Sequence, residues 1–180
     1  MEFCYTAPAW LEFKTIQLQD VRSQMQFVID LSRRNVEHET GGPFAAAVFT
    51  HYGRLHGVGV NRVMPENCSI LHAEVMALMS AHQTSSDWDL SGGLRLVTSC
   101  QPCCMCFGAI LWSGISVMVY GANADDARSV GFDEGPLVED WASQMRQRSI
   151  QVIGPVLREE AVAVLDQYAE QGTIYNPGTP

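Results

Sequence analysis

Two short segments of the chain carry the residue types best suited to chemistry: 72–74, which reads HAE, and 102–106, which reads PCCMC. Together they contain three side chains of the kinds that bind zinc: His72, Cys103 and Cys106. Three protein ligands leave the fourth position of a tetrahedral zinc site open, and zinc lowers the pKa of water bound there. Glu74 lies beside this ligand set and can move the proton. The two segments therefore predict a catalytic zinc site, with Glu74 as general acid and base.

The spacing of the cysteines favours one register of ligands. Cys103 and Cys106 are three residues apart and share a face of a helix. Pro102 suits the first position of a helix, so both thiols are expected in the first turn, where free N–H groups and the helix dipole favour thiolates. Cys100 and Cys103 also form a C-x-x-C pair, but the position of Pro102 favours the later pair.

Two plainer readings compete with a catalytic zinc site. A structural zinc site has four protein ligands, and the fourth would have to be Cys100, Cys104 or a distant histidine. A redox pair like that of thioredoxin has no need of segment 72–74. Catalytic zinc is therefore favoured. The remaining cysteines are expected to be buried or idle thiols: Cys4, Cys68, Cys100 and Cys104.

Length and composition suit one globular domain. The chain has 180 residues, of which 47% are hydrophobic and 17% charged. We expect a single zinc-dependent catalytic domain over 1–180, with 172–180 as a C-terminal tail rich in glycine and proline. Because two cysteines are assigned to metal, a reducing, cytoplasmic location is expected. Residues 1–14 lack the pattern of a secretory signal, and no apolar run approaches the ~20 residues of a membrane span.

The charge balance limits the partners. The chain has 11 basic and 20 acidic residues, a net charge of −9, and no basic cluster. A protein that grips nucleic acid needs lysine and arginine to neutralise phosphates. We therefore expect no nucleic-acid partner and a small, uncharged substrate.

The hydrophobic pattern alternates strands and helices after an initial hairpin. Strands are expected at 44–50, 54–60, 94–98, 115–120 and 150–156, and helices at 20–37, about 71–79 with Ser69 as N-cap, 103–113, 137–147 and 157–170. This order predicts an α/β fold, a three-layer α/β/α sandwich with a five-stranded mixed sheet. Both metal-binding segments then fall at helix N-termini, beside strand ends.

Several segments resemble a known superfamily. The H-x-E and P-C-x-x-C segments, with AAAV at 45–48, resemble the cytidine deaminase-like zinc deaminases. FGAI at 107–110 is similar to the branch with guanine and tRNA adenosine deaminases, and GFDE at 131–134 to the bacterial guanine deaminases, a likeness that extends from about 41 to 175. Two positions differ: Gln101 stands where glutamate is common, and Glu134 where some guanine deaminases have aspartate.

The resemblance implies one Zn²⁺ per chain, a cytidine deaminase-like fold and a homodimer with the C-terminal segment near the partner's site. Glu134 becomes a second catalytic carboxylate that accepts hydrogen bonds from the base. Expected substrate contacts are Phe44, Asn61, Ala73 and Trp112, with Asn61 at the far edge of the base and the two aromatic rings as stacking faces. The plainer alternatives are core aromatic residues, an asparagine in a turn, and a glutamate that caps the segment after it.

The favoured function is hydrolysis of guanine to xanthine and ammonia. Close alternatives are deamination of ammeline or a related s-triazine, or of guanosine. A tRNA adenosine deaminase conflicts with the acidic charge balance, and cytosine deamination leaves segment 131–134 unexplained. A non-catalytic zinc-binding scaffold or sensor is the alternative from another class, but such proteins usually lack the general acid and base, and Glu74 is present.

Overall fold

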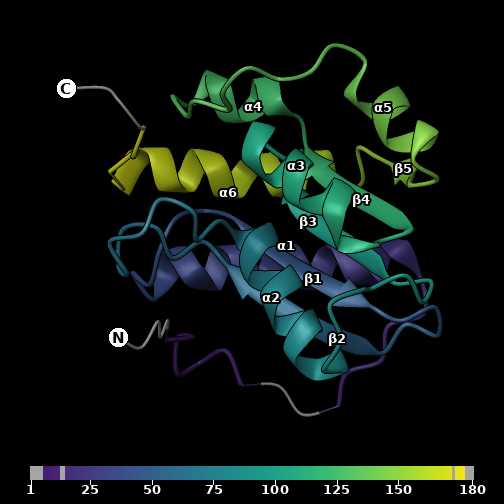
Figure 1. Cartoon of the computed structure of the whole chain (residues 1–180). Helices are drawn as coiled ribbons and strands as arrows, with labels where there is room; N and C mark the ends of the chain where they lie inside the picture. The colour runs from purple at the N-terminus through teal and green to yellow at the C-terminus, as the bar shows by residue number, and fades with distance from the viewer. Residues whose placement is uncertain (1–5, 13–14, 172, 177–180) are drawn as a thin grey trace.

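The computed structural model describes residues 6–12, 15–171 and 173–176, and it is built around one five-stranded sheet (Figure 1). The strands are β1 (Ala45–Phe49), β2 (Leu55–Val60), β3 (Arg95–Cys100), β4 (Val117–Ala122) and β5 (Gln151–Ile153). Their order in the sheet is β2-β1-β3-β4-β5. β1 is antiparallel to both β2 and β3, whereas β3, β4 and β5 are parallel. The predicted five-stranded mixed sheet is thus confirmed.

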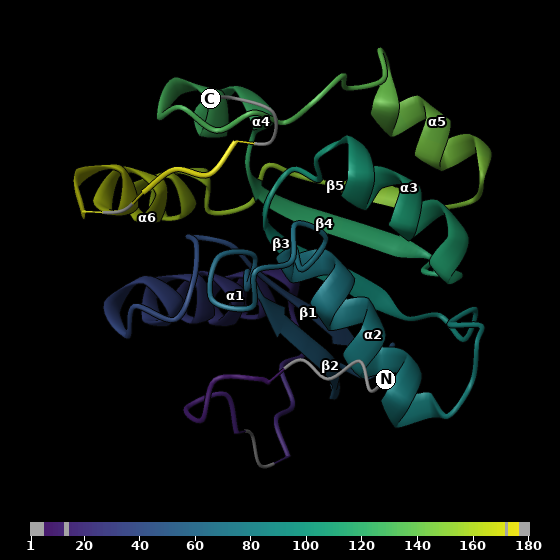
Figure 2. The same ribbon diagram turned by 60° about the vertical axis from the view of Figure 1, so that its left-hand side comes forward.

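Helices cover both faces of this sheet (Figures 1 and 2). They are α1 (Val21–Glu37), α2 (Ala73–Ser85), α3 (Cys104–Ser113), α4 (Ala124–Ser129), α5 (Trp141–Gln147) and α6 (Arg158–Gln171). α1 and α6 pack on one face and share one apolar cluster with the sheet. α2, α3 and α5 contribute to a second cluster on the other face. The result is the expected three-layer arrangement.

β1 lies at the centre of the core and shows how the two faces are filled. All five of its residues are buried. Ala45, Ala47 and Phe49 belong to the cluster beneath α1 and α6. Ala46 and Val48 belong to the cluster beneath α2 and α3. Successive side chains of a strand point to opposite faces, so a strand buried on both sides is apolar throughout.

Two glycines of β2 let α2 approach the sheet closely. A Cβ atom on Gly59 would lie 2.3 Å from the backbone nitrogen of Ala77 and 2.4 Å from the carbonyl oxygen of Ala73. A Cβ atom on Gly57 would lie 2.7 Å from the carbonyl oxygen of Ala77. Only glycine leaves room for such contacts, so the β2 backbone sets the position of the first turn of α2.

Several elements differ from the sequence predictions. α4 was not predicted. Asn123 caps it, and the Asp126 carboxylate accepts a hydrogen bond from the backbone N–H of Asn123, which stabilises a helix too short to show periodicity. The helix expected at 137–147 begins only at Trp141. The strand expected at 150–156 is limited to β5, because proline at 155 cannot donate a ladder hydrogen bond.

The ends of the chain are described only in part. Of the predicted tail at 172–180, residues 173–176 are described and form neither helix nor strand. Cys4 lies outside the described residues. Within the described part of the chain, every helix is too short or too polar to cross a membrane.

Candidate active site

The candidate site lies at one edge of the sheet, where three strands begin or end. β3 ends at Cys100, and the start of β1 lies beside this end because Ala45 N–H donates to Ser99 Oγ at 3.1 Å. β2 ends at the same edge, where Asn61 N–H donates to the carbonyl of Phe44 at 3.0 Å. The antiparallel pairing of β1 therefore brings Phe44 and Asn61 to the carboxyl end of β3.

The metal-binding residues occupy the first positions of two helices. His72 is the N-cap of α2 and Cys103 is the N-cap of α3. Two sequence predictions were therefore wrong in register: Ser69 does not cap α2, and Pro102 precedes α3 instead of opening it. Both N-cap residues have extended backbone dihedrals, which point their side chains away from the helix and toward the space between α2 and α3.

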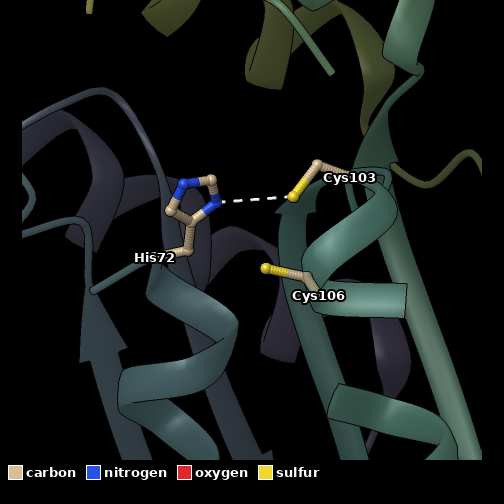
Figure 3. Close-up of side chains that lie close together, drawn as sticks. All are labelled: His72, Cys103 and Cys106. Atoms are coloured by element: carbon tan, nitrogen blue, oxygen red, sulfur yellow. Dashed lines mark hydrogen bonds between the residues drawn. The ribbon is translucent and has the colours of Figure 1, made fainter. Parts of the chain in front are cut away.

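The three predicted zinc ligands lie together between these helices (Figure 3). His72 Nδ1 is 3.5 Å from Cys103 Sγ, and the ligand atoms of His72, Cys103 and Cys106 all lie within 4.8 Å of one another. Tetrahedral zinc with bonds of about 2.0–2.3 Å keeps its ligand atoms roughly 3.5 Å apart. The side chains therefore fit a zinc ion after small movements.

The other two cysteines near the site have different surroundings. Cys100 Sγ lies 3.6 Å from the carbonyl oxygen of Asn123, and burial raises the pKa of this thiol well above its usual value. Cys104 Sγ lies against Gly135. In contrast, hydrogen bonding from Cys106, together with the hydrogen bond and charge of His72, lowers the pKa of Cys103 to about 4. A readily formed thiolate suits Cys103 as a ligand.

A cavity of about 250 Å³ opens beside the three ligands. Phe44, Asn61 and Ala73 line it, in agreement with their predicted place at the substrate site. Trp112 does not line it and is 84% exposed, so the prediction that Trp112 stacks on the base was wrong. Six residues at about 100° per residue separate Trp112 from Cys106, which turns the Trp112 side chain roughly 120° around α3 from the ligand Cys106.

Two buried carboxyl groups face this cavity. Glu74 is 6% exposed and Glu134 is 7% exposed. Burial raises the pKa of Glu74, and it raises that of Glu134 to about 8 with help from the negative charges of Cys103 and Glu74. Cys106 Sγ lies 3.3 Å from Glu74 Oε2, which places this carboxyl directly against the metal ligands. Carboxyl groups with raised pKa values are suited to take up and return protons near neutral pH.

An aromatic wall of the cavity was missed by the sequence analysis. Phe132 packs edge-on against Phe44 with ring centroids 4.9 Å apart and stacks on Tyr168 at 6.0 Å. Tyr175 also lines the cavity. Phe132 belongs to segment 131–134, in which only Glu134 was given a role. Tyr168 falls in the helix expected at 157–170, where an aromatic residue is not distinguished from a core residue by sequence, and no local signal marks Tyr175.

The C-terminal segment lies against the loop that carries Glu134. Asn176 Nδ2 donates to the carbonyl of Gly131 at 2.8 Å, and Asp133 N–H donates to Asn176 Oδ1 at 2.8 Å. Tyr168 Oη donates to the carbonyl of Thr173 at 2.8 Å. The described part of the C-terminal segment thus contacts the cavity loop of its own chain.

Fold and site together define a zinc-dependent hydrolytic deaminase. Residues 18–122 match the model of the cytidine and deoxycytidylate deaminase zinc-binding region, and the chain belongs to this family. Its cofactor is zinc, as the ligand set His72, Cys103 and Cys106 indicates.

The most informative relatives are guanine deaminases. A solved structure of guanine deaminase from Nitrosomonas europaea superposes with a TM-score of 0.91 at 39% identity, covering 94% of this chain and 97% of that one. A variant of the protein NE0047 in complex with 8-azaguanine also has a TM-score of 0.91 at 39% identity, over 94% of this chain and 96% of that one. Guanine deaminase from Bacillus subtilis is 33% identical over 68% of this chain and 77% of its own length.

Proposed function

We propose that this protein hydrolyses guanine to xanthine and ammonia. The observation that carries the proposal is the second buried carboxyl, Glu134, in the same cavity as Glu74 and the three metal ligands. Hydrolysis at a metal site needs one proton carrier, which Glu74 provides. A second acidic group suits a substrate rich in N–H donors, and guanine carries such donors on its ring and its 2-amino group. The similarity to guanine deaminases supports the same substrate.

Glu74 moves the protons in this scheme. When bound, zinc acts as a Lewis acid and lowers the pKa of a coordinated water. Glu74 accepts a proton from the attacking water and delivers it to the ring nitrogen beside the 2-amino carbon. It then takes the proton of the new hydroxyl on that carbon and passes it to the leaving amine. The raised pKa of Glu74, caused by burial, makes this carboxyl a stronger base and lets it hold the proton between the transfers.

The other cavity residues bind and orient the base. The Glu134 carboxylate accepts hydrogen bonds from the ring and amine N–H groups, and it can take part in proton transfer because its pKa is raised to about 8. Phe44 and Phe132 provide apolar surface for the base, and Asn61 provides a polar contact at the edge of the cavity. Buried polar groups that match a substrate's donors also reject analogues that lack them.

A substrate panel tests the proposal. The zinc-loaded protein is incubated with guanine, guanosine, ammeline, adenine and cytosine, and ammonia release is measured. We expect the highest kcat/KM for guanine. A higher kcat/KM for ammeline or guanosine would show that guanine is not the preferred substrate but would leave hydrolytic deamination in place. If the zinc-loaded protein released ammonia from none of the compounds, a scaffold or sensor would be favoured.

We further propose one deaminase domain over 1–180, acting in the cytoplasm as a homodimer. The free thiols Cys68, Cys100 and Cys104 suit a reducing compartment.

α3 is almost entirely apolar, yet only three of its residues are buried: Cys106, Ile110 and Ser113. An apolar helix face beside the exposed Trp112 suits contact with a second copy. Sedimentation velocity should show a dimer that Trp112→Ser weakens; a monomer at all concentrations would reject the dimer.

A further inference from the structure

A buried side chain of α1, Asn35, spans two segments of the cavity wall. Asn35 is 0% exposed. Its Nδ2 donates to the carbonyl of Gly42 at 2.8 Å and to the carbonyl of Asn61 at 3.0 Å. A side-chain amide has two N–H donors, and both are used here. The Asn35 side chain therefore joins the loop after α1 to the loop after β2.

The two joined segments are the part of the wall that carries Asn61. Gly42 and Asn61 both line the cavity, and a Cβ atom on Gly41 would lie 1.9 Å from the carbonyl oxygen of Asn61. The backbones thus touch directly, and the Asn35 amide sets their relative position. Loss of this amide leaves two partly buried carbonyls without their donor, and the segments must move to find new ones.

The orientation of the Asn61 side chain depends on this backbone position. Asn61 Oδ1 accepts a hydrogen bond from Val63 N–H at 3.3 Å. Within the described part of the chain, Asn61 Nδ2 donates to no protein acceptor, so it is available to a ligand acceptor in the cavity. A shift of the Asn61 backbone moves this donor relative to Glu74 and Glu134.

Hydrogen bonds from neighbouring side chains hold the Asn35 side chain in place. Thr40 Oγ1 donates to Asn35 Oδ1 at 2.8 Å and accepts from Trp10 Nε1 at 3.0 Å. The Trp10 ring stacks on His38 with centroids 5.6 Å apart, and the Arg34 guanidinium lies over the same ring at 4.7 Å. The chain of hydrogen bonds Trp10–Thr40–Asn35 thus leads from the N-terminal segment to the cavity wall.

We propose that Asn35 is a positioning residue for substrate binding, which acts through Asn61. It touches neither the metal ligands nor the reacting atoms. The inference rests on the proposed deamination of guanine only for its kinetic readout. Its expected signature is weaker base binding with normal zinc content and nearly normal chemistry.

The test compares zinc-loaded Asn35→Ala with a matched control, Gln24→Ala. Gln24 is also a 0% exposed amide of α1; it donates to the carbonyl of Leu18 at 2.8 Å and lies at the other end of the helix. We expect Asn35→Ala to raise KM for guanine about tenfold, the effect of one lost buried hydrogen bond, with kcat within about threefold. Gln24→Ala should lower the melting temperature but leave KM unchanged.

A double-mutant cycle then tests the route through Asn61. If Asn35 acts through Asn61, the double variant Asn35→Ala/Asn61→Ala has the same KM as Asn61→Ala alone. If the KM of the double variant instead showed the product of the two single effects, the proposal would be overturned. A rise of KM in Gln24→Ala equal to that in Asn35→Ala would also overturn it. Should Asn35→Ala fail to fold, Thr40→Val carries the test, with an expected twofold to threefold rise in KM; an unchanged KM there would reject the idea.

Two further readouts need no turnover and so separate this inference from the proposed function. Amide hydrogen exchange of peptides over 41–45 and 60–64 should be faster in Asn35→Ala and unchanged in Gln24→Ala. The Kd for 8-azaguanine, measured by calorimetry, should rise with KM. If guanine is not turned over but exchange and Kd change as expected, the proposed function fails while the positioning role holds. Unchanged exchange in both segments would overturn the role itself.

Discussion

The two halves of the active site are built on different supports. The metal-binding half consists of His72, Cys103 and Cys106, at the beginnings of two helices packed on the sheet. The recognition half is the loop 131–135 between α4 and α5, which lies outside the sheet (Figure 2). The carbonyl of Glu134 in this loop accepts Cys104 N–H at 3.2 Å.

Under the proposed function, the metal-binding half carries out the chemistry and the loop 131–135 recognises the substrate. The backbone of α2, which positions His72, cannot shift without disturbing the core, because α2 packs directly on Gly57 and Gly59 of β2. The recognition loop is held by exposed hydrogen bonds to Asn176 and by the packing of Phe132 on Phe44 and Tyr168, so it can change without moving the sheet. A rigid base for the reaction and a replaceable loop for the substrate allow one fold to deaminate different rings.

Removal of a metal ligand should have the largest effect. Cys106→Ala takes one of two thiolates from the ligand set, so zinc content and activity should both fall to background. Metal analysis by mass spectrometry checks this. Cys104→Ala is the matched control and should retain one zinc per chain, because its sulfur lies against Gly135 and not in the ligand cluster. Full zinc retention in Cys106→Ala would reject the ligand assignment.

Glu74→Gln should retain zinc and fold but lose nearly all turnover. The amide cannot accept the proton, and general acid–base catalysis alone typically contributes about 10²–10⁴-fold. Both kcat and kcat/KM should fall, with zinc occupancy verified in the same sample. Near-normal turnover would exclude Glu74 as the proton carrier and weaken the division between a chemical half and a recognition half.

The same division explains how much the sequence could predict. The metal-binding half follows short-range rules: ligand types, their spacing, and helix N-termini after strands. The sequence therefore predicted the three ligands, Glu74 and the sheet. The recognition half depends on contacts between distant segments, such as Phe132 with Tyr168. No local pattern encodes these contacts, and Trp112 was misplaced because aromatic character alone does not tell which side of α3 it occupies.

Glu134→Gln should impair guanine turnover about 10²-fold while leaving zinc content unchanged, since it removes an acceptor for the base and a possible proton carrier. The preference for guanine over ammeline should also weaken, as measured by kcat/KM for both compounds. If both values are unaffected, Glu134 serves only to cap its loop, and the guanine-specific part of the proposal loses its main support.

The stability of Glu134→Gln relative to the wild type should increase as the pH rises. Burial raises the pKa of Glu134 from about 4.5 to about 8, so ionisation of this carboxyl costs folding free energy above pH 4.5, and the cost levels off near pH 8. Glutamine removes that cost. The melting temperature of Glu134→Gln should therefore exceed that of the wild type by a margin that widens from pH 5.5 to pH 8. A constant margin would contradict the raised pKa.

Gly59→Ala tests the rigid support of the metal-binding half. The added methyl group would lie 2.3 Å from a backbone nitrogen of α2, so the helix must shift, at a cost of roughly 1–3 kcal/mol. Denaturant unfolding measures the loss, and kcat should fall with it because His72 and Glu74 move. Gly92→Ala is the control, since a Cβ atom there meets nothing within 4 Å. Equal stability of the two variants would argue against close packing as the support.

Asn176→Ala should have the smallest effect and should act on the recognition half alone. It removes the acceptor for Asp133 N–H and the donor to the Gly131 carbonyl, both in an exposed setting where water replaces much of the loss. We expect KM for guanine to rise about threefold to tenfold, with zinc content and melting temperature unchanged. Asn176→Asp keeps the acceptor but places a carboxylate oxygen against the Gly131 carbonyl, so its KM should rise at least as much as that of Asn176→Ala. A lower melting temperature with unchanged KM would show that the C-terminal segment stabilises the fold and does not position the cavity loop. The recognition half would then not depend on this segment, and the contrast between the supports of the two halves would be weaker than the hydrogen bonds indicate.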